Sequence, residues 1–316
     1  MQFSKDVFIP ALKKSGTTSL WLLKMILPIS LGVRLLDYYE LLAYMATILD
    51  PLFVYLGLPG STAIVFLTSI FLPLYAPIAI ITSMSITLRE LTILALMCQI
   101  AHNLPVESAI QGKTGTTFKG MTILRIFMGI VAGFILNLVL PKEMGMPLFN
   151  QTDVIAINSI GELLIAWLKS SLKIALLIAA IVFSLNLLYN ILNSYNLVEK
   201  LSKGLNPILK FFGLPENTGF LLLIGYIVGL AYGGALMMDQ MKDGKVSRTE
   251  ANLLNHHLAL SHSVIEDNLL FVALGVSIWW ILGVRLSLAW IVVWTRRFFL
   301  NLKSGKLRFS IKRNDI

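Results

Sequence analysis

Cysteine and charged side chains are both scarce in this chain of 316 residues. The single cysteine, Cys98, cannot form an internal disulfide bond. Asp, Glu, Lys and Arg together make up only 14% of the sequence, whereas 56% of the residues are hydrophobic and the mean hydropathy is +0.78. This composition excludes an ordinary soluble domain and a disordered chain. It is typical of a protein with several membrane spans.

Motifs of the common enzyme classes are also lacking. The sequence has no glycine-rich phosphate loop ending in Lys-Ser or Lys-Thr, no HExxH and no serine nucleophile elbow. We therefore expect no enzyme activity, no catalytic residue and no cofactor. No compact pair of ligand pairs has the spacing of a structural zinc site, so no resident metal is expected, while transient coordination of a transported divalent ion stays open.

The positive charge of the chain is explained by membrane topology. Lys and Arg number 26 against 17 Asp and Glu, a formal net charge of +9. The basic residues flank apolar segments and form no patch interleaved with aromatic residues, so no nucleic-acid partner is expected. Lys and Arg are retained on the cytoplasmic side of membrane proteins. The basic leader, 1–18, and tail, 298–316, therefore predict a bacterial cytoplasmic membrane protein with both termini in the cytoplasm.

Six apolar runs are long enough to cross a bilayer as helices, which takes about 20 residues. Helices are expected because each satisfies its own backbone hydrogen bonds in lipid. The sequence therefore predicts an all-α integral membrane protein in contact with the lipid bilayer. The runs are Ser19–Leu36, Thr62–Ser85, Met121–Leu140, Leu172–Leu192, Thr218–Met238 and Val272–Trp294.

An internal repeat relates the two halves of the chain. The triplet Gly57–Pro59 recurs as Gly213–Pro215, at an offset of 156. Matched polar residues inside apolar segments follow at an offset of 160, and they are harder to obtain by chance than matched leucines. They are Glu90 with Glu250, His102 with His262, Glu107 with Asp267, and Arg125 with Arg285. We predict two membrane repeats, 19–141 and 172–297, joined by an external linker, 142–171.

Loop charges predict that the repeats have opposite orientations. Both termini are basic, whereas the linker carries Lys142 against Glu143 and Asp153, which indicates an external position. One repeat then begins inside and ends outside, and the other does the reverse. The basic loop Lys242–Arg248 is an exception, because this scheme places it outside.

An odd number of crossings per repeat follows from that inversion. We expect the first, second and last apolar segments to cross, so that the histidine-bearing helix turns back or is interrupted at a break. The breaks are expected at HNLPVES, where Pro105 cannot continue a helix, and at HSVIEDN. The predicted fold thus has two inverted-topology repeats with broken or re-entrant helices. Their breaks meet near the midplane, where such transporters bind cargo.

Ionisable groups at membrane depth cost roughly 2.5–3.5 kcal/mol each on insertion scales and so indicate a functional site. The alternative is that both breaks are interfacial loops. The second break is more acidic and is expected to hold the solute more tightly. Polar residues after the second Gly-Leu-Pro turn either cap a helix or bind ligand. The predicted substrate-binding residues are His102, Asn103, Glu107, Glu216, Asn217, Thr218, His262, Ser263, Glu266, Asp267 and Asn268.

Two arginines, Arg125 and Arg285, lie well inside predicted spanning helices. At that depth they need acidic or carbonyl partners. The acids of the breaks are candidates, and so are Glu90 and Glu250. The sequence alone leaves both pairings open.

The run Gly213–Phe271, which begins GLPENTGFLLLIGYIVGLAYGG and ends NLLNHHLALSHSVIEDNLLF, resembles the nucleoside-recognition or Gate domain family. That family includes stand-alone bacterial membrane proteins, the spore maturation proteins and the membrane part of the ferrous-iron transporter FeoB. It is distantly similar to concentrative nucleoside transporters. The likeness is clearest over the second repeat. It implies a transporter-like fold and leaves the cargo open.

We therefore predict a transporter-like protein that binds a small polar, nucleoside-like solute at the midplane between two inverted repeats. Protons or a cation are the expected coupling ion, since titratable groups in transporters often have that role. One alternative is a membrane scaffold or subunit that transports nothing. Another is a divalent-metal permease of the ferrous-iron kind. A homo-oligomer is left open.

Overall fold

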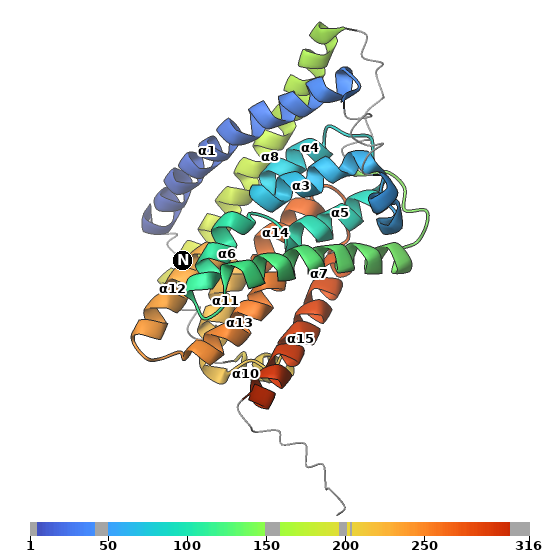
Figure 1. The fold of residues 1–316 in the computed structure, drawn as a ribbon. Coiled ribbons are helices and arrows are strands. Elements are labelled where there is room, and N and C mark those ends of the chain that lie inside the picture. The colour runs from blue at the N-terminus through green and yellow to red at the C-terminus, as the bar shows by residue number, and fades with distance from the viewer. Residues whose placement is uncertain (1–4, 42–49, 149–158, 196–200, 203, 304–316) are drawn as a thin grey trace, which may run out of the picture.

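The computed structural model describes residues 5–41, 50–148, 159–195, 201–202 and 204–303 (Figure 1). These residues are almost wholly helical, and no strand occurs among them. The first half comprises α1 Lys5–Tyr38, η1 Val54–Leu56, η2 Gly60–Thr62, α3 Ala63–Phe71, α4 Tyr75–Ile81, α5 Leu88–Ile100, α6 Leu104–Lys113 and α7 Phe118–Val139. The second half comprises α8 Ile160–Ser194, α10 Asn206–Phe211, η4 Glu216–Thr218, α11 Gly219–Ile227, α12 Leu230–Lys242, α13 Arg248–Ser261, α14 Val264–Val272 and α15 Ile278–Lys303.

Within the described residues, four helical segments are long and apolar enough to cross a membrane. They are Leu88–Lys113, Phe118–Val139, Ile160–Leu192 and Ile278–Leu302. A fifth is added if Asp50–Leu56 and Gly60–Phe71, which meet at 92°, form one span. The prediction of an all-α membrane protein is confirmed. Three of these spans overlap predicted runs, and Leu88–Lys113 contains the histidine-bearing helix of the first half.

The predicted spans at Thr62–Ser85 and Thr218–Met238 each divide into two short helices. In the second half, α11 and α12 pack against each other, and Gly233 of α12 lies against Gly225 of α11. Asn217, just before α11, donates its side-chain amide to the carbonyl of Lys245, just after α12, at 2.9 Å. The chain therefore returns to the side from which it entered. The expectation that this segment crosses is wrong, because the turn before Leu230 interrupts a run that is long enough to span.

Both histidine-bearing helices are interrupted, and in the first half α5 and α6 together form one segment long enough to span, Leu88–Lys113. Asn103 separates α5 from α6 with φ of 50°, and Ser263 separates α13 from α14 with φ of 47°. Each of these left-handed residues donates its backbone N–H to the neighbouring short-helix pair. Asn103 donates to the carbonyl of Ser69 at 2.8 Å, and Ser263 donates to the carbonyl of Gly225 at the same distance. The predicted breaks are confirmed, and protein covers their backbone as membrane depth requires.

Contacts at the ends of the broken helices indicate their directions. The start of α5 and the end of α14 both meet the segment after α7: Leu88 donates to the carbonyl of Gly145 at 3.0 Å, and Leu148 donates to that of Leu274 at 3.2 Å. At the other ends, Asn252 of α13 donates to the carbonyl of Gly115, just after α6, at 2.7 Å. These are the contacts expected of antiparallel broken helices. The inverted arrangement of two whole repeats stays a prediction.

The basic loop between α12 and α13 lies at the opposite end of α15 from the linker. Leu148 of the linker packs on Gly275, just before α15, whereas Thr249 shares a pocket with Arg297 and Asn301, near the end of α15. Because α15 is long enough to span a membrane, the expected placement of this loop on the linker side is wrong. The loop shares a side with basic residues of α15, which removes the charge conflict.

The predicted division into segments does not coincide with helix ends. Helix α1 begins at Lys5, inside the predicted leader, and α8 begins at Ile160, inside the predicted linker. Helix α15 extends to Lys303, and the rest of the predicted tail lies outside the described residues. The division itself stays a prediction.

Candidate functional site

The two breaks meet through their histidines. The Nε2 atoms of His102 and His262 are 3.3 Å apart. Glu107, in the first turn of α6, places one carboxylate oxygen 3.4 Å from Nε2 of His102 and the other 3.2 Å from Nε2 of His262. None of these side chains is more than 9% exposed. Three predicted site residues therefore form one buried cluster with members from both halves.

Backbone carbonyls fix the orientation of both imidazole rings. Nδ1 of His102 lies 3.0 Å from the carbonyl oxygen of Gln99, and Nδ1 of His262 lies 2.7 Å from that of Leu258. A carbonyl oxygen only accepts, so each Nδ1 carries a hydrogen and donates it. In a neutral ring, Nε2 then has a free lone pair. Both lone pairs belong to atoms that face the shared cluster.

Two fully buried arginines support the breaks from equivalent positions. Arg125 donates through Nε to the carbonyl of Ile100 at 2.7 Å and through Nη2 to that of His102 at 3.1 Å. Arg285 does the same with the carbonyls of Leu260 and His262, at 2.9 and 2.7 Å. These bonds satisfy acceptors that the interruption leaves without helical donors.

The arginines also pair with the acids of the breaks. Nη1 of Arg125 lies 2.5 Å from Glu107, and Nη2 of Arg285 lies 3.4 Å from Asp267. The pairing that the sequence left open is therefore with break acids and carbonyls. Glu90 and Glu250 have another role, since each closes a capping box at the start of α5 or α13.

Two residues that sequence reasoning did not assign to the site join the second break to the first half. The hydroxyl of Tyr75 donates to Glu266. The amide nitrogen of Gln99 donates to the carbonyl of Asp267 at 2.9 Å and to the side-chain oxygen of Asn268 at 3.2 Å. A polar residue inside a helix buried from Leu91 to Ile100 was the available signal for Gln99.

Asn103 and Ser263 shape the backbone of the breaks. The tip of the α11–α12 pair approaches Ser263 closely at Gly229, whose φ is 93°, and a Cβ there would lie 2.6 Å from the Ser263 hydroxyl. Glycine is therefore needed for both the conformation and the contact. Solute contact by either residue stays a prediction.

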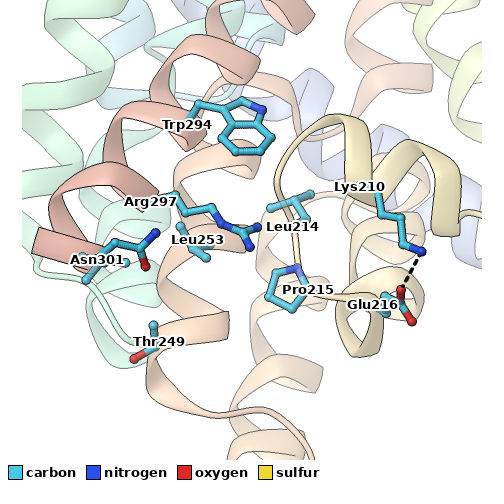
Figure 2. Close-up of a pocket in the computed structure, with 10 residues that line it drawn as sticks. Lys210, Leu214, Pro215, Glu216, Thr249, Leu253, Trp294, Arg297 and Asn301 are labelled. Atoms are coloured by element: carbon cyan, nitrogen blue, oxygen red, sulfur yellow. Dashed lines mark ion pairs between the residues drawn. The ribbon is translucent and has the colours of Figure 1, made fainter. Parts of the chain in front are cut away.

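The remaining predicted residues, Glu216 to Thr218, lie apart from the breaks. Figure 2 shows Glu216 paired with Lys210, at 3.2 Å, beside a pocket of about 460 Å³ that is also lined by Trp294 and Arg297 of α15. The hydroxyl of Thr218 donates to the carbonyl of Pro215 at 2.6 Å. The break residues are not among those that line this pocket. Ligand binding by these three residues stays a prediction.

Comparison with known proteins gives two matches. Residues 19–119, which contain the first break, match the family model named Gate and described as nucleoside recognition. The chain is 31% identical over 288 residues to the uncharacterized membrane protein YvoD of Bacillus subtilis (strain 168), and the alignment covers 90% of this chain and 92% of that protein. No solved structure matches.

Proposed function

We propose, from the premise that this chain belongs to the nucleoside-recognition (Gate) family of membrane proteins, that it binds a small polar solute between its broken helices and transports it. The family is linked to solute recognition and transport rather than to catalysis. A nucleoside-like molecule is the solute that we propose. The proposed setting is a bacterial cytoplasmic membrane with both termini in the cytoplasm, in keeping with the basic residues at the end of α15.

The observation that carries this proposal is a pair of unsatisfied polar atoms, one in Arg285 beside the second break and one in Gln99, which reaches that break from α5. Among the described residues, neither Nη1 of Arg285 nor the side-chain oxygen of Gln99 has a hydrogen-bond partner. Leaving a buried donor or acceptor unpaired costs about 1–3 kcal/mol, so such atoms point to a ligand. One is a donor and the other an acceptor. A solute with both kinds of group, as in a nucleoside, would satisfy them.

Binding of a solute of that size requires the two breaks to separate. The two histidines are in contact. Gln99 of the first half donates to Asp267 and Asn268 of the second. Tyr75 of the first half donates to Glu266 of the second. Each of these cross-break hydrogen bonds is to a group that a polar solute can replace. Movement of one half against the other around a central site is the usual basis of alternating access.

Uptake by proteoliposomes tests this proposal. We expect radiolabelled nucleosides to accumulate in vesicles that contain the protein, and Glu266→Gln to lower the rate at least tenfold by removing the charge at the break. Glu250→Gln is the matched control, because the same change at the start of α13 affects a capping box and is expected to leave uptake within about twofold. No uptake above empty vesicles, or equal loss in both variants, contradicts the proposal.

Divalent-metal permeation is a second candidate function. The observation that favours it is the convergence of two imidazole nitrogens and a carboxylate at the point where the halves meet. The same vesicles, loaded with a metal-sensitive dye, test it. Entry of Fe²⁺ or Zn²⁺ that is lost in His262→Ala supports permeation, and equal dye response in empty vesicles contradicts it. Movement of neither nucleosides nor ions favours the scaffold alternative.

A further inference from the structure

We propose that His102, Glu107 and His262 bind a divalent first-row transition-metal ion, such as Zn²⁺, that links the two broken helices. One ligand atom from each of these residues can be chosen so that all three lie within 4.8 Å of one another, and all three residues are buried. His102 and Glu107 flank the first break, whereas His262 ends α13 at the second. The ligands therefore come from segments 160 residues apart.

The hydrogen bonds of the rings leave three acceptors facing one another. Because both Nδ1 atoms donate to carbonyls, the two Nε2 atoms of neutral rings have no hydrogen to share. The Glu107 carboxylate is an acceptor as well. Lone pairs this close repel unless a proton or a metal cation lies among them. The carbonyl contacts also act as the outer hydrogen bonds that orient metal-binding histidines in proteins.

The spacing of the two imidazole nitrogens fits a tetrahedral ion, and the Glu107 carboxylate lies beside both of them. Histidine nitrogens and carboxylate oxygens lie about 2.0–2.2 Å from Zn²⁺, so neighbouring ligands in a tetrahedron are about 3.3–3.6 Å apart. The observed separations are 3.3 Å between the Nε2 atoms, 3.4 Å from Nε2 of His102 to one oxygen of Glu107 and 3.2 Å from Nε2 of His262 to the other oxygen. Binding of a single ion therefore requires the carboxylate to turn one oxygen toward both rings. Three protein ligands leave one position for water or a solute group. Two imidazoles and a carboxylate suit zinc and its first-row neighbours.

The charges around the cluster also favour a cation. The breaks hold three carboxylates, Glu107, Glu266 and Asp267, against the two guanidiniums of Arg125 and Arg285. With neutral histidines and all three carboxylates ionised, this group of five has one negative charge in excess. Arg125 lies close to Glu107 and opposes a cation there, so we expect weaker affinity than in a site without it. The same contact holds the carboxylate toward the histidines.

Metal binding by the full chain in detergent tests this inference. After treatment with a chelator, Co²⁺ is added as the probe, because it occupies tetrahedral sites and absorbs visible light there. We expect one saturable ion per chain that Zn²⁺ displaces, and at least a tenfold loss of affinity in both Glu107→Gln and His262→Ala. His256→Ala is the control, since Nδ1 of His256 contacts the carbonyl of Asn252 at 2.7 Å and the residue lies outside the cluster. It is expected to bind as the wild type does.

Three outcomes overturn the inference: no saturable binding by the wild type, equal binding by all variants, and equal loss in His256→Ala. Gel filtration shows whether each variant stays folded. If Glu107→Gln does not, His102→Gln, which removes the ring but no charge pair, replaces it and is expected to show the same loss. Glu266→Gln separates this inference from the proposed solute transport. It keeps all three ligands, so we expect it to bind one Co²⁺ per chain with a smaller loss of affinity than Glu107→Gln, and to transport nucleosides poorly, so either activity can fail alone.

Discussion

The two breaks share a backbone scaffold and differ in how their acids meet it. In each, an arginine donates to two carbonyls at equivalent positions, and a left-handed residue donates to a short-helix pair. The acid is a glutamate in the first break and an aspartate in the second. A carboxylate oxygen of Glu107 lies 2.5 Å from Nη1 of Arg125, whereas a carboxylate oxygen of Asp267 lies 3.4 Å from Nη2 of Arg285. One methylene group accounts for the difference.

This difference is the basis for the separate roles that we propose for the two breaks. The longer Glu107 side chain reaches both its arginine and the histidine pair, so the first break provides most of the proposed metal ligands. The shorter Asp267 leaves Nη1 of Arg285 without a partner among the described residues. The second break therefore has an unpaired donor that the proposed solute would bind. In the two proposals, a shared scaffold with unequal acids thus separates ion binding from solute binding.

Removal of the arginines is expected to have the largest effect and to be unequal. In Arg125→Met, a buried carboxylate loses its partner and two carbonyls lose donors, and breaking such a buried pair costs about 3–5 kcal/mol. Arg285→Met breaks a longer ion pair, so we expect a smaller loss. Thermal unfolding in detergent, followed by fluorescence, measures both. Equal losses, or a greater loss in Arg285→Met, contradict the comparison.

Lengthening the second acid is expected to have an intermediate effect. In Asp267→Glu the carboxylate gains the reach of Glu107 and bonds Arg285 fully, a charged hydrogen bond worth about 1.5–3 kcal/mol. We expect a higher unfolding temperature and, because Nη1 of Arg285 is then occupied, slower solute uptake. Asp243→Glu makes the same change in an exposed loop and is expected to alter neither. A lower unfolding temperature in Asp267→Glu shows that the site lacks room for the methylene.

The sequence predicts the positions of the breaks but not which segments turn back. The polar matches at the offset of 160 identify the two breaks, and both contain a left-handed residue. In contrast, Thr218–Met238 is as long as a span, and length alone does not distinguish one crossing from two short helices. The distinguishing contacts, such as that of Gly229 with Ser263, lie between segments far apart in the chain.

For the site, too, the sequence predicts the kinds of partner that a residue needs but not contacts between segments far apart in the chain. The arginines were expected to bind acids or carbonyls because isolated charge is unstable in lipid, and they bind both. The bonds of Gln99 and Tyr75 join residues 168 to 191 positions apart. No periodicity or spacing encodes such contacts. Glu216 follows a turn that matches one in the first half, but that turn lies beside a pocket that the break residues do not line.

The smallest expected difference concerns the left-handed residues of the breaks. A left-handed conformation costs an ordinary residue about 1–2 kcal/mol, while asparagine tolerates it better. Glycine removes that strain but costs about 0.5–1 kcal/mol in chain entropy. We therefore expect Ser263→Gly to stabilise the fold by about 0.5 kcal/mol and Asn103→Gly to be neutral or slightly destabilising, measured by unfolding temperature in detergent. An equal gain in both variants shows equal backbone strain, and the contrast between the breaks then rests on their acids alone.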